Sequence, residues 1–364
     1  MIKVGINGFG RIGRIAFRIG LLKHSDEIEF SAINTSGSMD VAGWAHLVNY
    51  DTTYREFQYK VQSTERQEPP LIGELMVSEK NIKVPVLAEP DPSRIPWSKY
   101  GVEVVIESTG KFVTEEDAKK HAIGGAKRVV ISAPVRGGNV GTYVIGVNPP
   151  SLGASEGQVI SNSSCTTNCV APVMAVLHSK FGVEKAAMTT THAYTDDQNL
   201  QDGSHKDLRR ARAAAQNIVP TTTGAAISTT ETIPELKGVF DGRALRVPVP
   251  CGSITDFAVI LKKNVTVEEV NRAFIDASNN PLYKGILATS DQPLVSSDII
   301  GRSESSIVDL LLTQVIGGNL VKVFAWYDNE WGYANRLVEQ VIRVGRNLTG
   351  GKVPTDPITL SFKP

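Results

Sequence analysis

Residues 161–169 (SNSSCTTNC) surround a cysteine with hydroxyl and amide side chains. A structural cysteine behaves as a small hydrophobic residue and normally has apolar neighbours. Cys165 follows hydroxyl residues suited to capping a helix, and the N–H groups and dipole of a helix N-terminus stabilise a thiolate. Cys165 is therefore a candidate nucleophile, whereas Cys169 and Cys251 are interpreted as packed, structural thiols.

A nucleophilic thiol needs a neighbouring base, and the chain has six histidines. His192 is preferred because it ends a β-prone run and precedes a polar loop, where sheets commonly present catalytic groups. A structural role for His192 stays open at this point. Cys165 and Cys169 have no companion His or Cys cluster that would complete a zinc site, so no metal is expected.

Residues 7–14 (NGFGRIGR) form a G-x-G-x-x-G motif between a predicted strand and a predicted helix. In this context Gly8, Gly10 and Gly13 allow a tight turn, close approach of a pyrophosphate, and close packing of helix on strand. The motif predicts a dinucleotide site for NAD(P) or FAD.

The acidic residue expected at the end of the second strand, about 20 residues further on, is missing. Residues 32–38 read AINTSGS instead. A carboxylate repels a 2′-phosphate, whereas hydroxyl and N–H groups accept one, so this segment makes NADP an alternative to NAD. The other interpretation is a capped polar turn that lacks one NAD contact.

A small basic cluster at residues 206–212 (KDLRRAR) precedes a hydroxyl-rich turn at residues 220–226 (PTTTGAA). Such a turn into a helix is typical of phosphate sites, so an anionic substrate is one interpretation. The alternative is a solvated helix face with local ion pairs. An RNA-binding stripe is less favoured because aromatic residues are not interleaved.

Length and composition limit the remaining classes. The chain of 364 residues suits two domains, and its formal net charge is zero, so neither nucleic acid nor an acidic membrane surface is favoured. Three cysteines do not make a disulfide framework and fit a reducing compartment. With no leader-like or membrane-spanning apolar run, a soluble cytoplasmic protein is expected.

The predicted elements change character near residue 164. Before it, β-like runs alternate with helical stretches, which predicts an α/β domain with a Rossmann-type, doubly wound parallel sheet. The expected strands there are residues 2–6, 28–33, 102–106, 128–131, 142–147 and 159–160. After it come a helix to about Phe181 and long β-prone runs at residues 186–191, 244–249, 255–261 and 320–326.

Several of these later runs lack intervening helices, which favours an α+β domain with a mainly antiparallel sheet. A final amphipathic helix, residues 333–347, is expected to pack back on the first domain. The predicted domains are 1–164 with 330–364, for cofactor binding, and 165–329, for catalysis.

Ordered motifs over nearly the whole chain closely resemble the phosphorylating glyceraldehyde-3-phosphate dehydrogenase family (type I). They are INGFGRIGR from Ile6, ESTGKF from Glu107, SNSSCTTNC from Ser161, HAYTDDQ from His192, DLRRARAAAQNIVPTTTGAA from Asp207, LRVPVP from Leu245 and WYDNEWGY from Trp326. The resemblance implies reversible oxidation of glyceraldehyde 3-phosphate with inorganic phosphate to 1,3-bisphosphoglycerate, with hydride transfer to NAD(P).

The resemblance also implies roles for individual residues. Cys165 resembles the nucleophile that forms a thiohemiacetal and then a thioester, and His192 resembles its base. Thr195 and Arg246 resemble the pair that binds the C3 phosphate of the substrate. Residues resembling the site of the attacking phosphate are Ser164, Thr166, Arg210, Thr223 and Gly224. Positions resembling cofactor contacts are Gly8, Gly10, Arg11, Ile12, Gly13, Asn34, Thr35, Ser36, Ser108, Gly110, Ser132, Ser204 and Asn329.

The chain departs from the commoner glycolytic pattern in ways that favour NADP, alone or together with NAD. Thr35 replaces the aspartate that favours NAD, and Gly203 and Ser204 replace a Leu-Pro pair, as in photosynthetic, NADP-using relatives. Those relatives commonly retain the aspartate, however, and Pro90 stands where an arginine is sometimes found.

Family analogy further implies a homotetramer. Erythrose-4-phosphate dehydrogenase and a non-catalytic binding role are the alternative functions. The physiological direction, glycolytic or gluconeogenic and carbon-fixing, stays open.

Overall fold

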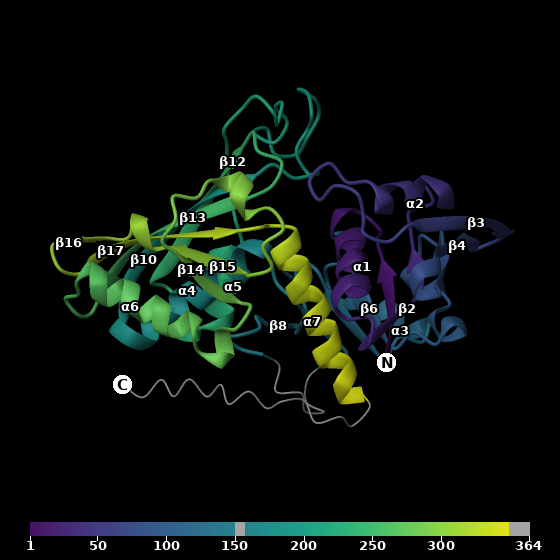
Figure 1. Cartoon of the computed structure of the whole chain (residues 1–364), viewed down its shortest axis with the longest axis horizontal. Coiled ribbons are helices and arrows are strands. Elements are labelled where there is room, and N and C mark those ends of the chain that lie inside the picture. The colour runs from purple at the N-terminus through teal and green to yellow at the C-terminus, as the bar shows by residue number, and fades with distance from the viewer. Residues whose placement is uncertain (150–156, 349–364) are drawn as a thin grey trace. The chain divides into compact units, whose positions relative to one another are not determined.

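A computed structural model describes residues 1–149 and 157–348 (Figure 1). The contacts between Cα atoms group these residues into two units. The first comprises Met1–Tyr143 and residues 157–163 and 334–348, and the second comprises Val144–Pro149 and Ser164–Tyr333. The predicted domains, 1–164 with 330–364 and 165–329, also include residues 150–156 and 349–364, which lie outside the described residues.

The first unit contains a largely parallel sheet. Its strands are β1 (Ile2–Asn7), β2 (Ile28–Asn34), β3 (Val61–Glu68), β4 (Leu71–Val77), β5 (Ile82–Leu87), β6 (Val104–Glu107), β7 (Arg128–Ile131), β8 (Gly141–Thr142) and β9 (Val159–Ser161). Its helices are α1 (Arg11–Lys23), α2 (Val41–Asn49), α3 (Glu115–Ile123) and most of α7 (Trp331–Leu348).

The strands are ordered β3-β4-β5-β2-β1-β6-β7-β9-β8, and the neighbours are parallel except at β3/β4 and β4/β5. From β1 the chain first builds the sheet toward β2 and then returns to add β6 on the other side. The predicted doubly wound sheet is confirmed, with its direction of growth reversing between β1 and β6. In such sheets ligands bind beyond the carboxyl ends of the strands at this switch point.

One predicted strand of this region is wrong. Of residues 142–147, only Thr142 belongs to a strand, and a turn follows in which the Val147 amide donates to the Val144 carbonyl at 3.0 Å. Gly146 adopts a positive φ of 90° in this turn. Val144 is nevertheless fully buried, so the apolar run reflects burial in the core and not β-structure.

The second unit contains a mainly antiparallel sheet, as predicted. Its strands are β10 (Val183–Ala193), β11 (Val219–Thr221), β12 (Phe240–Val247), β13 (Ser253–Leu261), β14 (Leu287–Ser290), β15 (Ser306–Asp309), β16 (Gln314–Ile316) and β17 (Leu320–Tyr327). They follow the path β11-β12-β10-β13-β17-β15-β14, with β16 paired to β17. Among the described pairs, only β10/β12 and β14/β15 are parallel.

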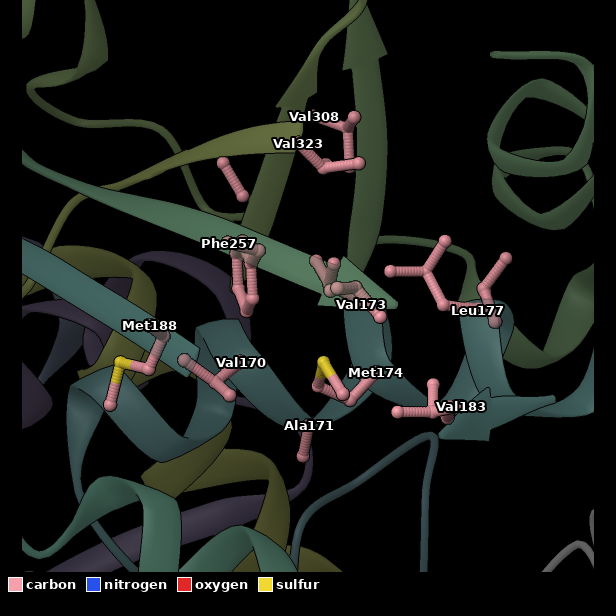
Figure 2. Packing of buried hydrophobic residues seen from close by; sticks show 14 of the residues in the cluster. Val170, Ala171, Val173, Met174, Leu177, Val183, Met188, Phe257, Val308 and Val323 are labelled. Carbon is pink, nitrogen blue, oxygen red and sulfur yellow. The ribbon is translucent and has the colours of Figure 1, made fainter. Parts of the chain in front are cut away.

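Helix α4 (Cys165–Phe181) is held by the core of the second unit. With α5 (Ala225–Thr232) and α6 (Val267–Ser278), it lies on one face of the sheet (Figure 1). Its side chains Val170, Val173 and Met174 are buried and face the β10 and β13 side chains Met188 and Phe257 (Figure 2). Because this packing fixes the axis of α4, it also fixes where the helix begins, at Cys165.

Helix α7 carries the apolar stripe predicted for the last stretch, and Leu337, Val341 and Val344 are all buried. Within the first unit, Lys23 Nζ donates to Asn335 Oδ1 at 2.8 Å, and Arg346 pairs with Glu27. These contacts join α7 to α1 and to the turn that follows α1.

Candidate active site

Cys165 is the first residue of α4, as the sequence predicted. The hydroxyl of the N-cap residue Ser164 accepts a hydrogen bond of 3.1 Å from the Thr167 amide. This cap sets the first turn of the helix, so the half-buried Cys165 side chain emerges at the end where N–H groups and the helix dipole favour negative charge.

His192 lies near the end of β10, and its Nε2 atom is 3.4 Å from the Cys165 sulfur. The parallel register of β10 and β12 sets His192 beside Arg246, whose Nη1 atom is 2.8 Å from His192 Nδ1. Nδ1 is also 2.7 Å from the Ala193 carbonyl oxygen. We assign the proton to Nδ1, since this tautomer donates to that carbonyl and directs the lone pair of Nε2 at the thiol.

Burial shapes the acid–base properties of this pair. It raises the pKa of the Cys165 thiol, while the charge of Arg246 and hydrogen bonds from Thr166 oppose the shift. Burial, together with Arg246, lowers the pKa of His192 to about 3. The imidazole is therefore neutral near pH 7 and able to accept the thiol proton.

Contacts extend from His192 to the residues expected to bind phosphate. Arg246 Nη1 donates to Thr195 Oγ1 at 3.1 Å, and Thr195 in turn donates to Asp197. Arg210 pairs with the other oxygen of the Asp197 carboxylate. Arg210 also donates to Thr221 Oγ1 from Nε at 3.0 Å and from Nη2 at 2.9 Å.

The remaining phosphate candidates lie at two helix starts. Thr166 is in the first turn of α4, and its hydroxyl is bonded to that of Tyr327 at 3.0 Å. Thr223 and Gly224 immediately precede α5, where the Thr223 hydroxyl accepts from the Ala225 amide at 3.1 Å.

Two residues at this site were missed by sequence reasoning. Asp197 lies within the HAYTDDQ motif, but nothing in that motif indicated that it would bond two phosphate candidates. Tyr327 is buried, and its ring packs edge-on against His192 with centroids 5.9 Å apart. Its hydroxyl is also bonded to Thr190 at 2.8 Å. The sequence feature that could have indicated Tyr327 as a site residue is its position at the end of β17, within the WYDNEWGY motif.

The cofactor candidates of the first unit follow four parallel strands, at the edge that contains the switch point. Gly8, Gly10, Arg11, Ile12 and Gly13 follow β1; Asn34, Thr35 and Ser36 end or follow β2; Ser108 and Gly110 follow β6; and Ser132 follows β7. The Ser108 hydroxyl donates to the Gly8 carbonyl at 2.8 Å, which ties the loops after β1 and β6 together.

The glycine loop fits a pyrophosphate. Gly8 has a positive φ of 94°, and a Cβ on Gly13 would lie 2.2 Å from the Gly8 oxygen, so both positions require glycine. A Cβ on Gly10 would meet no described atom within 4 Å, so the loop is open there. Among the described residues no side chain caps α1, which leaves its N-terminus suited to phosphate.

The segment after β2 presents one hydroxyl inward and one outward. Asn34 donates from Nδ2 to Asn7 Oδ1 at 2.7 Å and to the Glu89 carbonyl at 2.9 Å. Thr35 is 3% exposed, and its hydroxyl donates to the Leu87 carbonyl at 3.0 Å. Ser36 is exposed. Of the two hydroxyls, the one on Ser36 is available to a ligand.

Two further cofactor candidates lie in the second unit. Asn329 is buried, and its side-chain oxygen accepts from the Gly252 amide at 3.2 Å and from the Ser253 hydroxyl at 2.9 Å. This leaves the Nδ2 group of Asn329 as the donor it can present to a carboxamide. Ser204 is exposed on the loop after β10, and its carbonyl accepts from Asn199 at 3.4 Å.

The other thiols and the remaining site classes differ from Cys165. Cys169 and Cys251 are buried, as predicted, and burial raises the pKa of Cys169 to about 12. No described group of three or more His, Cys, Asp or Glu side chains is arranged to hold a metal ion. Within residues 1–149 and 157–348, no helix is both long enough and apolar enough to cross a membrane.

A glycine-rich sheet edge suited to a dinucleotide in one unit and a cysteine–histidine pair near arginines in the other are features of a nicotinamide-dependent oxidoreductase. Residues 2–115 match the family model "Glyceraldehyde 3-phosphate dehydrogenase, NAD binding domain". Residues 164–329 match "Glyceraldehyde 3-phosphate dehydrogenase, C-terminal domain". The chain belongs to the glyceraldehyde-3-phosphate dehydrogenase family.

Relatives with this name are similar over almost their whole length. A glyceraldehyde-3-phosphate dehydrogenase of Streptomyces coelicolor is 51% identical over 95% of this chain and 99% of its own length. Glyceraldehyde-3-phosphate dehydrogenase 1 of Bacillus cereus is 50% identical over 93% of this chain and 97% of its own. Glyceraldehyde-3-phosphate dehydrogenase 2 of a Synechocystis strain is 47% identical, with coverage of 95% and 99%.

Proposed function

We propose that the chain catalyses the reversible, phosphorylating oxidation of glyceraldehyde 3-phosphate to 1,3-bisphosphoglycerate. The observation that carries this proposal is the Cys165 sulfur 3.4 Å from His192 Nε2, beside Arg246 and Thr195. A thiol, a neutral base and an anion site together are what a phosphorylated aldehyde requires. The proposed functional division is residues 1–164 with 330–364 for the cofactor and 165–329 for catalysis.

In the first step His192 Nε2 takes the proton of Cys165, and the thiolate sulfur adds to the aldehyde carbon to give a thiohemiacetal. The Cys165 backbone N–H, at the start of α4, stabilises the oxyanion. Preorganised donors of this kind are worth about 3 kcal/mol each in other enzymes. His192 returns its proton to the oxyanion, which gives the hydroxyl of the thiohemiacetal, and then, neutral again, accepts that hydroxyl proton as the thiohemiacetal is oxidised to a thioester.

The bound nicotinamide supplies the hydride acceptor for that oxidation. Asn329 would hold its carboxamide through Nδ2, because the Oδ1 atom is already engaged by Gly252 and Ser253. The glycine loop and the uncapped N-terminus of α1 would hold the pyrophosphate.

Two anion subsites would bind the phosphate groups. Thr195 and Arg246 would bind the C3 phosphate of the aldehyde, which orients its carbonyl toward Cys165. Ser164, Thr166, Arg210, Thr223 and Gly224 would bind the inorganic phosphate that attacks the thioester. Arginine suits both subsites because its planar guanidinium binds phosphate oxygens in pairs.

We further propose that the cofactor is NADP, used alone or together with NAD. The hydroxyl of Thr35 is already bonded to Leu87, so the contact with a 2′-phosphate is assigned to Ser36, with Ser204 as a second candidate. Steady-state kinetics with each cofactor test this preference, and at least a tenfold better kcat/KM with NAD would refute it.

The loop after β10 supports a homotetramer. Its side chains Leu200, Leu208 and Ile218 are 79%, 81% and 68% exposed in the single chain, which is unusual for large apolar residues. Light scattering on the purified protein would measure the assembly. The three free thiols fit a cytoplasmic location.

The central test is formation of reduced cofactor from glyceraldehyde 3-phosphate, assayed with and without inorganic phosphate. Sustained turnover should depend on phosphate, and alkylation of Cys165 by iodoacetamide should abolish it. Activity that survives complete alkylation of Cys165 would contradict the mechanism. Faster turnover of erythrose 4-phosphate under the same conditions would change the assigned substrate.

A further inference from the structure

The two oxygens of the Asp197 carboxylate accept hydrogen bonds from two different parts of the site. Oδ1 accepts from the Thr195 hydroxyl, and Oδ2 accepts from Nη1 of Arg210. Thr195 also accepts from Arg246 at 3.1 Å, so Asp197 contacts Arg210 directly and is linked to Arg246 through Thr195.

In the proposed function, the same donor groups bind the phosphate groups of the two substrates. Thr195 belongs to the subsite for the C3 phosphate, and Arg210 belongs to the subsite for inorganic phosphate. A carboxylate, like a phosphate, offers these donors negatively charged oxygens. Asp197 therefore makes, within the chain, hydrogen bonds that the two phosphates would otherwise make.

The charge of Asp197 is maintained by its surroundings. Partial burial raises the pKa of this carboxyl, but the hydrogen bond from Thr195 and the charges of Arg246 and Arg210 together bring it below the usual value. Asp197 is thus an anion throughout the neutral range and competes with other anions for the same donors.

The hydrogen bonds to Asp197 can be replaced by hydrogen bonds to a phosphate, because both donor residues keep other partners. Arg210 stays anchored through Nε and Nη2, both of which donate to Thr221 Oγ1, and its Nε lies 3.5 Å from Asp207. Thr195 stays bonded to Arg246. Asp197 itself is 43% exposed, so its side chain can turn into water without leaving either partner unsupported.

We propose that Asp197 is an internal anion that occupies the donors of both phosphate subsites in the ligand-free protein and gives them up when phosphate groups bind. The inference rests on the proposed function for the identity of the two subsites. Its consequence is that Asp197 weakens binding at both subsites, so that affinity for phosphate is set partly by this competition.

Binding of sulfate to the cofactor-free protein tests the proposal without any turnover. Isothermal calorimetry would compare the wild-type chain with Asp197→Asn, which keeps the shape and removes the charge. Loss of one negative charge about 5 Å from a dianion should tighten sulfate binding by roughly tenfold or more at low salt. The gain should shrink as ionic strength rises.

Asp202→Asn is the matched control. Asp202 lies on the same loop, and its contacts among the described residues are with Arg212 and the Ala213 amide, and not with Thr195 or either subsite arginine. Its substitution should leave the affinity for sulfate unchanged. Unchanged or weaker sulfate binding in Asp197→Asn would overturn the proposal, since a carboxylate that merely positions Thr195 and Arg210 predicts weaker binding. Asp197→Ser provides a second variant if the amide misfolds.

Kinetics add a readout that a structural role would not produce. In Asp197→Asn the KM values for glyceraldehyde 3-phosphate and for inorganic phosphate should both fall severalfold, whereas the KM for unphosphorylated glyceraldehyde should not change. Absence of dehydrogenase activity in the wild-type chain would refute the proposed function. The inference about Asp197 would then be decided by the sulfate-binding experiment. An equal change of all three KM values would overturn the inference and leave the proposed function intact.

Discussion

His121 in the first unit and His192 in the second are both buried, yet their surroundings differ in kind. The Trp97 indole donates to His121 Nδ1 at 3.0 Å, which fixes the His121 proton on Nε2, from where it is donated to Glu107 at 2.9 Å. Glu107 also accepts from Asn7 at 2.6 Å. Every ring nitrogen of His121 thus has one partner of the right kind.

The hydrogen bonds of the His192 ring are not matched to its two nitrogens in this way. Its Nε2 atom faces a thiol, and its Nδ1 atom lies within hydrogen-bond distance of both a carbonyl and a guanidinium, although it can satisfy only one of them. The charged side chain at hydrogen-bond distance from this ring is the cation Arg246. Burial beside a nucleophile and a cation favours the neutral base, whereas closed hydrogen bonding as in His121 favours a fixed structure.

The largest effect is expected when Cys165, the thiol that faces His192, is replaced. Replacing the thiol in Cys165→Ser leaves a hydroxyl that His192 cannot readily deprotonate, so kcat should fall by about 10⁴-fold or more. Cys169→Ser, one helical turn away, is the control, because Cys169 is fully buried against the core. It should keep kcat and lower the free energy of unfolding by about 1–2 kcal/mol. Comparable losses of kcat in both variants would remove the distinction between the two thiols.

The next effect compares the two histidines directly. His192→Asn removes the base and should lower kcat by about 10²- to 10⁴-fold with little change in the melting temperature. His121→Asn should do the reverse, since it leaves the buried Trp97 indole without its acceptor and removes one of the hydrogen bonds to Glu107, at a cost of about 1–3 kcal/mol in stability. Stopped-flow assays and thermal unfolding of both variants measure the two quantities. A collapse of kcat in folded His121→Asn would break the comparison.

The pH dependence of stability should also separate the wild type from His192→Asn. The pKa of His192 is about 3 in the folded chain, against about 6.5 in the unfolded chain. Between these values only the unfolded chain binds the proton, so the stability of the wild type falls as the pH is lowered. From pH 7 to pH 4 this group accounts for about 3 kcal/mol. Urea unfolding at both pH values should show that the difference is missing in His192→Asn, and parallel losses in both proteins would contradict the assigned pKa.

Sequence patterns predicted many of the elements that build the two sheets, because those elements are apolar along their length or have clear helix periodicity. Strand β7 was predicted with its observed bounds, and α4 was predicted to end at its observed last residue, Phe181. In the first unit, strands β3, β4 and β5 were missed. Five of the eight residues of β3 are exposed, so polar positions such as Glu65 and Arg66 hide the strand.

At the site, residue type and local position selected Cys165, since a helix start after hydroxyl residues is visible in the sequence. They could not decide among the histidines, and His192 depended on the strand end and on family resemblance. The contact of His192 with Arg246 joins residues 54 positions apart through the register of β10 and β12. Tyr327 and Asp197 were not identified from the sequence for the same reason, because their contacts in the site are with residues that only the fold brings together.

The smallest expected effect concerns two hydroxyl groups of the first unit. One is satisfied by a hydrogen bond within the protein, as the His121 ring is, and the other is available to a ligand. Thr35 resembles His121, since its hydroxyl is buried and bonded to Leu87. Ser36 is exposed, and among the described residues its hydroxyl is bonded within its own turn, to the Ser38 hydroxyl at 2.8 Å and the Ser38 amide at 3.4 Å. If Ser36 contacts the 2′-phosphate, Ser36→Ala should lower kcat/KM for NADP by about two- to tenfold, the net value of a typical hydrogen bond at an exposed position. The same protein assayed with NAD is the internal control and should be unaffected, because NAD lacks that phosphate. Equal losses with both cofactors would mean that Ser36 shapes the turn after β2, and the selection of NADP would then have to come from Ser204.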